Sequence, residues 1–197
     1  VTGVQTCALP ISTSGTTRAP KFVLHPQSSI TRHAADMARA FQFEAAEVKS
    51  LLTVPLCGVF GLCNATATLA AAKPLVMLTT FEAEAAATAI EQHRITHFAA
   101  VGDIVAQLLK ARSGPIPYPS VRMVIGARTG QAAPAQARGL KLVGVYGMSE
   151  IQGMLCLRGL DEPPETRELG GGTLVAAEAR VRARDTTTGE ILAHGKS

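Results

Sequence analysis

Short apolar runs alternate with segments of helical periodicity along most of the chain. In the helical segments, apolar residues recur every three or four positions. A first helix is expected from Ser28 or Ser29, because either residue can cap it and an apolar face follows directly. The residues on that face are Ile30, Ala34, Met37 and Phe41. The pattern predicts a helix that packs on a core through one side.

The later segments predict an alternation of strands and helices. The expected strands are 51–57, 74–80, 96–101, 121–127 and 140–147, and the expected helices are 61–72, 82–94, 103–112 and 132–139. Short apolar strands separated by helices predict an α/β fold with a mainly parallel sheet covered by helices on both faces. In such sheets, ligands bind at the carboxyl ends of the strands.

The last part of the chain changes character. The polar stretch DEPPETRELGGG, 161–172, is typical of a loop, and the alternating sequence TLVAAEARVRARD, 173–185, predicts a further strand. We therefore expect a β-rich C-terminal segment.

The segment 51–72 carries no charged residue and is long enough to cross a bilayer. Pro55, Gly58, Gly61 and Asn64 interrupt it, however, and it divides into a strand followed by a helix. Burial in a globular core explains the lack of charge, so no transmembrane segment is expected.

Composition favours a globular protein with a core of small aliphatic residues. Hydrophobic residues make up 47% of the chain and aromatic residues only 4%. The net charge is +4, but no basic run with interleaved aromatic residues occurs, so nucleic-acid binding is not indicated. Cys57, Cys63 and Cys156 lack metal-ligand spacing and are typical of a reducing compartment, so a cytoplasmic location is expected.

Two other groups of residues invite assignment as sites. His93 and His97 have helical metal-binding spacing, but a helix-to-strand change is expected between them, so two ordinary histidines are the better interpretation. Cys57 and Cys63 are interpreted as core residues. No Gly-x-Ser-x-Gly motif indicates a hydrolase.

The first eleven residues, VTGVQTCALPI, resemble a translated sequencing adapter. Residues 1–11 are therefore expected to contribute nothing to the fold, and residues 12–197 to form the functional part.

The stretch TSGTTRAPK, Thr13 to Lys21, combines features that suit phosphate groups. Gly15 lets the backbone approach a ligand closely, and Lys21 supplies a cation. The hydroxyl donors are Thr13, Ser14, Thr16 and Thr17. Such clusters also occur in ordinary turns, so this stretch alone does not identify a site.

The stretch VYGMSE ends an expected strand with residues that suit a nucleotide. Tyr146 can stack on a base, Ser149 can donate to a phosphate, and Glu150 can hold magnesium, which prefers oxygen ligands. By itself, a polar strand end would explain this segment equally well.

Together, the two stretches resemble the signatures of the adenylate-forming enzymes. TSGTTRAPKFV resembles the phosphate loop TSGT[ST]GxPKxV, with Arg18 where glycine is usual, and YGMSE resembles the motif YGxTE. Further similarity occurs in VPLCGVFGL, where Gly58 replaces a histidine. The resemblance covers almost all of residues 12–197 and implies a partial N-terminal AMP-binding domain, with the C-terminal lid domain beyond Ser197.

The resemblance also implies the chemistry. A carboxylate would attack the α-phosphorus of ATP, giving an acyl-adenylate and pyrophosphate, and CoA would then displace AMP. Tyr146 and Gly147 would bind adenine, Ser149 would touch the α-phosphate, and Glu150 would bind Mg²⁺. The residues that would hold the phosphates are Thr13, Ser14, Gly15, Thr16, Thr17 and Lys21. Catalytic roles are expected for Lys21, Ser149 and Glu150.

Two alternatives remain open. A peptide-synthetase adenylation domain would pass the acyl group to a carrier protein instead of CoA. A pseudoenzyme would bind nucleotide without turnover, which the departures at Arg18 and Gly58 favour. Residues near Val59, Phe60, Val101 and Gly102 are expected to line the acyl pocket, but the acid itself and the oligomeric state are open. The fragment itself is expected to be inactive.

Overall fold

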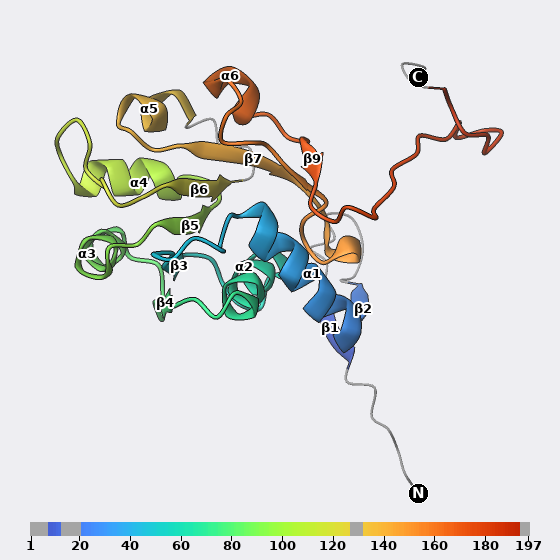
Figure 1. The fold of residues 1–197 in the computed structure, drawn as a ribbon, viewed down its shortest axis with the longest axis horizontal. Helices are drawn as coiled ribbons and strands as arrows, with labels where there is room; N and C mark the ends of the chain where they lie inside the picture. The colour runs from blue at the N-terminus through green and yellow to red at the C-terminus, as the bar shows by residue number, and fades with distance from the viewer. Residues whose placement is uncertain (1–7, 13–20, 127–131, 194–197) are drawn as a thin grey trace, which may run out of the picture.

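The computed structural model describes residues 8–12, 21–126 and 132–193 (Figure 1). The strands are β1 Ala8–Ser12, β2 Phe22–Pro26, β3 Ser50–Leu52, β4 Leu75–Met77, β5 His97–Ala100, β6 Met123–Gly126, β7 Leu142–Tyr146, β8 Cys156–Leu157 and β9 Thr173–Leu174. The helices are α1 Gln27–Ala40, α2 Val59–Ala70, α3 Ala83–His93, α4 Ile104–Ala111, α5 Ala132–Ala137 and α6 Pro164–Arg167, with a 3₁₀ turn, η1, at Ser149–Ile151.

Within the described residues, seven strands form one sheet in the order β4-β3-β5-β6-β7-β8-β9. The first five strands in this order are parallel, and β8 and β9 are antiparallel to their neighbours. The predicted α/β class and mainly parallel sheet are thus confirmed. Each predicted strand from 51 to 147 has an observed counterpart, although the observed strands are shorter.

Helices cover both faces of the sheet. The side chains of successive residues in a strand point to opposite faces of the sheet, and β6 shows that both faces are buried. Met123 and Ile125 pack in the core cluster that α1 and α2 share, whereas Val124 packs in the cluster that includes α3 and α4. The pattern of apolar residues therefore specifies two buried layers. In Figure 1, α1 and α2 lie together on one side of the sheet.

The first helix begins earlier than predicted. It starts at Gln27, with Pro26 as its N-cap and no side-chain cap. Ser29 does not cap it; instead, its hydroxyl donates to the carbonyl of Pro26 at 3.0 Å. The expectation of a serine cap is therefore wrong, because Pro26 ends β2 and the helix follows directly from the strand.

The segment before that helix is a hairpin. β1 and β2 pair antiparallel, from Ala8 opposite Pro26 to Ser12 opposite Phe22, and Ile11 is buried. The expectation that residues 1–11 take no part in the fold is thus wrong for Ala8–Ile11, because backbone pairing accepts almost any side chains. Residues 1–7 and the loop 13–20 lie outside the described residues.

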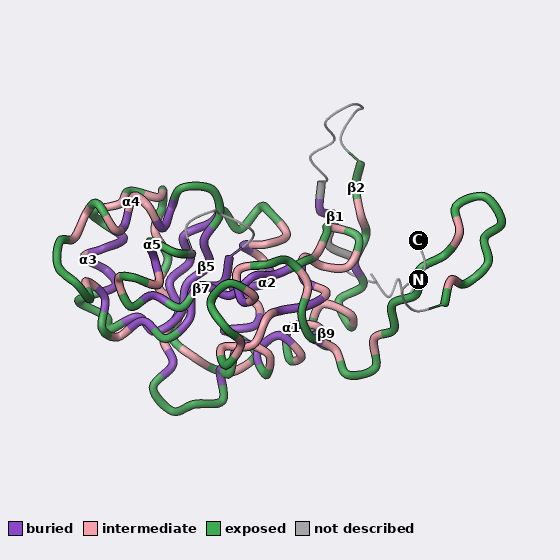
Figure 2. Tube along the Cα trace, turned by 90° about the horizontal axis from the view of Figure 1, so that it is seen from above, coloured by how far each residue is buried: buried purple, intermediate pink, exposed green. Residues whose placement is uncertain are grey.

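The predicted strand over 173–185 is largely absent. Only Thr173–Leu174 pair with β8, and an isolated bridge joins Arg184 to Ile191. Beyond β9 the chain runs away from the sheet (Figure 2), and Val181 is exposed. Alternation alone does not make a strand, since a strand also needs a partner whose backbone groups it can bond.

No helix in the described parts of the chain is both long and apolar enough to cross a membrane. The uncharged segment 51–72 instead forms β3 and α2, as expected.

Candidate nucleotide-binding site

The predicted segment Tyr146–Glu150 lies at the carboxyl end of β7. Residues 142–145 of this strand are buried, and Tyr146 emerges with 49% of its surface exposed. The next residue, Gly147, is closely packed against the backbone: a Cβ there would lie 1.9 Å from the carbonyl oxygen of Gly153. Only glycine therefore lets the chain turn at this point, which brings Ser149 and Glu150 back to the edge of the sheet.

A hollow of about 780 Å³ opens at this edge. It lies at the carboxyl ends of β5 and β7 and at the start of α2. The lining residues are Val59, Phe60, Val101, Val145, Tyr146, Gly147, Met148, Ser149, Gly153, Leu169 and Gly170. The half-exposed phenol ring of Tyr146 can stack on a planar group, and the Ser149 hydroxyl can donate a hydrogen bond.

The same hollow contains most of the residues expected near the acyl group. Val59, Phe60 and Val101 line it, whereas Gly102 does not. Gly58 is the N-cap of α2 and directly precedes Val59, and a Cβ there would lie 3.6 Å from the carbonyl oxygen of Pro55. The structure thus brings an apolar surface and the Tyr146–Ser149 segment together.

Glu150 faces a second, shallower hollow of about 440 Å³. This hollow is lined by Leu24, His25, Pro26, Ser29, Arg32, His33, Asp36, Glu150, Ile151 and Gln152. Its charges are partly compensated by neighbours, since Arg32 pairs with Glu178 at 3.4 Å and Asp36 pairs with Arg39. The turn η1 thus contributes Ser149 to one hollow and the exposed carboxylate of Glu150 to the other.

The predicted phosphate loop is only partly described. Lys21 is exposed and directly precedes β2. Thr13, Ser14, Gly15, Thr16 and Thr17 lie outside the described residues. The far end of β2 contacts η1, because Nε2 of His25 lies 2.7 Å from the carbonyl oxygen of Ser149. The strand that follows Lys21 therefore leads to the turn that carries Glu150.

Other candidate residues are separated by the fold. His93 ends α3 and is exposed, whereas His97 is buried in β5, where desolvation lowers its pKa to about 4. Cys63 is a core residue, and burial raises its pKa to about 12, but Cys57 is exposed and its assignment to the core was wrong. In the described parts of the chain, no cluster of three histidine, cysteine or acidic side chains is arranged to hold a metal ion.

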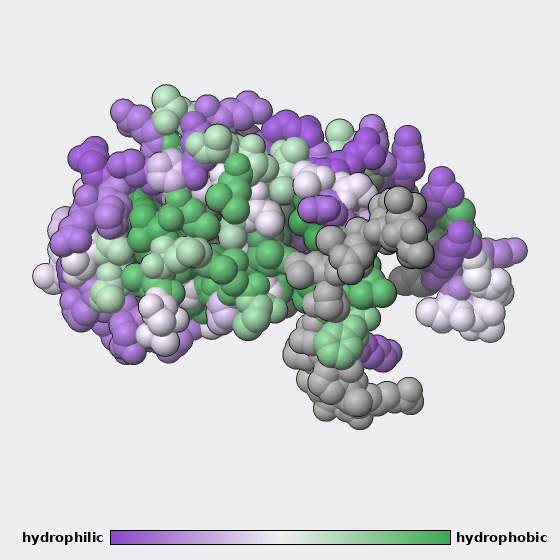
Figure 3. Space-filling view, turned by 90° about the horizontal axis from the view of Figure 1, so that it is seen from below, coloured by the Kyte–Doolittle hydropathy of each residue, from purple (hydrophilic) through white to green (hydrophobic). Residues whose placement is uncertain are grey.

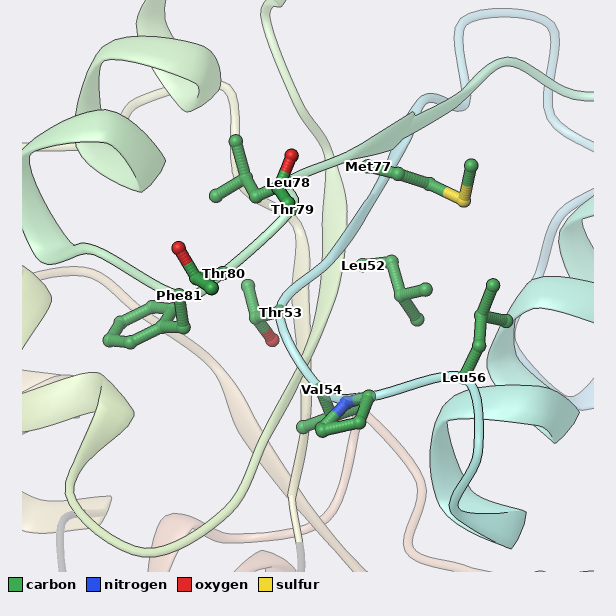
Figure 4. Close-up of a pocket in the computed structure, with 10 residues that line it drawn as sticks. Leu52, Thr53, Val54, Leu56, Met77, Leu78, Thr79, Thr80 and Phe81 are labelled. Atoms are coloured by element: carbon green, nitrogen blue, oxygen red, sulfur yellow. The ribbon is translucent and has the colours of Figure 1, made fainter.

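A third hollow, of about 490 Å³, lies at the carboxyl ends of β3 and β4 (Figure 4). Its labelled side chains include Leu52, Met77 and Phe81, together with threonines, and no charged residue lines it. None of the residues predicted to bind the nucleotide or the acyl group lines it. Sequence reasoning missed this hollow, although the apolar runs around residues 52 and 78 are visible in the sequence.

Sequence reasoning also missed His25 and Gln152. Both lie beside η1, and Nε2 of Gln152 donates to the hydroxyl of Ser29 at 2.6 Å. These contacts join residues more than 120 positions apart. No local pattern in the sequence signals such a pair.

The chain is similar in sequence to known ligases. The chain is 32% identical over 154 residues to indoleacetate–CoA ligase from Aromatoleum aromaticum, covering 75% of this chain and 30% of that protein. It is 27% identical over 154 residues to 4-coumarate–CoA ligase-like 6 from Oryza sativa subsp. japonica, covering 75% of this chain and 25% of that protein. The chain thus spans less than a third of either curated relative.

A solved structure shows the same fold. O-succinylbenzoate coenzyme A synthetase from Bacillus subtilis, in complex with ATP and magnesium ion, superimposes with a TM-score of 0.79 at 20% identity, covering 95% of this chain and 39% of that one. The family model for AMP-binding enzymes matches residues 5–197. Because this match takes in almost the whole chain, the chain belongs to the family of AMP-binding enzymes.

Proposed function

We propose that the chain is the nucleotide-binding part of a ligase that activates a carboxylic acid with ATP. The acid's oxygen bonds to the α-phosphorus of ATP as the bond to pyrophosphate breaks, which yields an acyl-adenylate. The thiolate of CoA then bonds to the acyl carbon, and AMP leaves. The observation that carries the proposal is the hollow at the end of β7, where Tyr146 and Ser149 meet an apolar wall.

The residues present fit a magnesium-bound nucleotide. Glu150 offers an exposed carboxylate, and magnesium prefers oxygen ligands. We assign Tyr146 and Gly147 to adenine, Ser149 to the α-phosphate, Glu150 to the metal, and Lys21 with the loop 13–17 to the outgoing phosphates. Positioning and charge neutralisation supply most of the catalysis in this chemistry, so no side-chain nucleophile is required.

The apolar lining of the hollow at the end of β7 favours a substrate whose acyl group carries no charge of its own. None of the residues that line the larger hollow carries a charge. A second carboxylate on the substrate would be desolvated there without a partner, which is costly. The names of the two curated relatives, both CoA ligases or ligase-like proteins, support CoA as the acceptor.

The test is exchange of labelled pyrophosphate into ATP by the complete protein. We expect exchange that requires both Mg²⁺ and a carboxylate whose acyl group carries no further charge, such as indoleacetate. Release of AMP on adding CoA would support the thiol as acceptor. A folded protein that binds ATP without exchange would instead support the pseudoenzyme, and AMP release only with a carrier protein would support the peptide-synthetase alternative.

Glu150 provides a sharper test of the metal assignment. In the complete protein, Glu150→Ala should lower the rate of pyrophosphate exchange by about 100- to 1,000-fold, because one preorganised electrostatic partner is lost. The thermal midpoint should not change, since the side chain is exposed. Glu44→Ala, which also removes an exposed carboxylate, is the control and should keep full activity. Equal activity of both variants would contradict the assignment.

We also propose a cytoplasmic location. Cys57, Cys63 and Cys156 are free thiols in the described structure, which supports a reducing compartment.

A further inference from the structure

His25 makes a buried contact with the turn that carries Glu150. The side chain is only 4% exposed, and Nε2 lies 2.7 Å from the carbonyl oxygen of Ser149. A carbonyl oxygen can only accept a hydrogen bond, so Nε2 must carry the proton and donate. This requirement fixes the protonation of Nε2, and the hydrogen bond links β2 to η1.

The C-terminal end of the turn, at Gln152, is also attached to the segment around Pro26 and Ser29. Nε2 of Gln152 donates to the hydroxyl of Ser29 at 2.6 Å, and that hydroxyl donates to the carbonyl of Pro26 at 3.0 Å. Both contacts therefore fall at the junction of β2 and α1. Glu150 lies between the two attachment points.

The remaining contacts of the turn attach it to the sheet and to α2. None of the three residues of η1 is buried. The residues that follow are attached to the core, because Met154 is buried and the N–H of Leu155 donates to the carbonyl of Tyr146 at 2.8 Å. Its own backbone bonds close the turn, from Gln152 to Ser149 at 3.2 Å and from Gly153 to Met148 at 2.9 Å, but they do not attach it to the hairpin. The contacts of His25 and Gln152 supply that attachment.

We infer that His25 is a positioning residue: it holds the Glu150 turn against the strand that follows Lys21. This inference rests on the proposed function, in which Glu150 binds the metal and Lys21 binds the phosphates. His25 is four positions after Lys21 in an extended strand, a separation of about 13 Å. The contact of His25 therefore sets the position of the turn that carries Glu150 relative to Lys21, at the other end of β2.

The first experiment measures hydrogen exchange in this chain with two matched variants. Gln in place of His25 can put an amide nitrogen where Nε2 was, whereas Met has similar length and no donor. In His25→Met, amides of 148–153 should exchange about 5- to 20-fold faster, since a hydrogen bond to a partly buried carbonyl is lost. In His25→Gln they should exchange at nearly the original rate. Amides of β5 and β6 should not change in either variant.

Three outcomes would overturn the inference. These are unchanged protection of the amides of 148–153 in His25→Met, identical behaviour of the two variants, and equally faster exchange in β5 and β6. The last result would show a general structural role. If both His25 variants fail to fold, Gln152→Leu decides instead, because it removes the second attachment from a partly exposed position. Unchanged exchange of 148–153 in that variant would also overturn the inference.

The second experiment links the contact to the metal. In the complete protein, His25→Met should raise the Mg²⁺ concentration for half-maximal pyrophosphate exchange by about tenfold, a loss typical of one hydrogen bond, and His25→Gln should restore it. A change in maximal rate without a change in Mg²⁺ dependence would contradict the positioning role. If the unaltered protein shows no exchange, the proposed function fails, while the hydrogen-exchange experiment still decides whether His25 holds the turn.

Discussion

Gly147 shows how closely the backbone is packed where the candidate site begins. A Cβ at this position would lie 1.9 Å from the carbonyl oxygen of Gly153, so the chain must shift if any side chain is present. We expect Gly147→Ala to lower the free energy of unfolding by about 1–3 kcal/mol, the usual cost of overpacking. Urea denaturation measures this change.

Gly58→Ala is the matched control for that variant. The nearest atom to a Cβ at Gly58 is the carbonyl oxygen of Pro55 at 3.6 Å, which is an ordinary contact. Its stability should therefore change little. Equal losses in both variants would show that close approach at Gly147 is not the cause.

His97 is expected to make stability depend on pH. Burial, together with the nearby charge of Arg122, lowers its pKa from 6.5 to about 4. The ring also packs edge-on against Phe43, with centroids 5.1 Å apart, and Nδ1 lies 2.7 Å from the Thr96 hydroxyl. The folded state thus resists protonation, whereas the unfolded chain accepts a proton near pH 6.5.

The stability due to neutral His97 is therefore complete above about pH 6.5 and is lost as the pH falls to about 4. The loss should be on the order of 3 kcal/mol over this range. Chemical denaturation at several pH values measures it, and His97→Asn, which does not titrate there, should reduce the slope. Identical slopes in both proteins would contradict the assignment of the pH dependence to His97. They would point instead to His33, because burial also lowers its pKa and it is present in both proteins.

At the scale of elements, the hairpin β1–β2 shows that residues 8–11 belong to the fold, whatever their origin. We still propose that residues 1–11 derive from an adapter. Removing 1–7 should leave the thermal midpoint unchanged, whereas removing 1–11 should lower it by about 3–10 °C, because burial of Ile11 and the pairing of β2 are lost.

Differential scanning calorimetry of the two truncated chains tests this expectation. Ile11→Ala separates the contribution of the side chain from that of strand pairing and should cause a smaller loss than removal of 1–11. If both truncations leave the midpoint unchanged, β1 contributes no stability.

At the scale of the molecule, apolar surface remains exposed. Leu56, Leu69 and Met77 are 45%, 65% and 58% exposed, and apolar side chains gather on the face over β4 and α2 (Figure 3). Patches of this kind usually mark an interaction surface or favour aggregation. The edge strand β4 adds unpaired backbone groups on the same side of the molecule.

We expect this chain alone not to catalyse adenylation. It spans 25–30% of its curated relatives. We propose that a complete ligase of this kind uses further charged groups at the site that this chain does not contain. Each missing partner should cost about 100- to 1,000-fold in rate. Pyrophosphate exchange by this chain beside the complete protein tests the expectation, and comparable rates would show that the described residues form a sufficient active site.

Local periodicity predicted most of the sheet. The parallel strands and the helices between them follow from side-chain patterns of a few residues each, which is why 96–101 and 103–112 contain β5 and α4. The Tyr146–Glu150 segment was also predicted at a strand end. The hairpin β1–β2 was missed, and the strand over 173–185 was predicted but stops at Leu174, because pairing depends on a partner strand as well as on the pattern.

The sequence by itself thus determined the α/β class, the order of the elements and the residue types available at the carboxyl edge of the sheet. Each of these is encoded within a short window, where burial and backbone geometry set the periodicity. Only the tertiary structure decided that His25 donates to Ser149 and that Val59, Val101 and Tyr146 share one hollow. Those contacts join distant parts of the chain, so they exist only once the packing of the helices on the sheet has fixed the position of every loop.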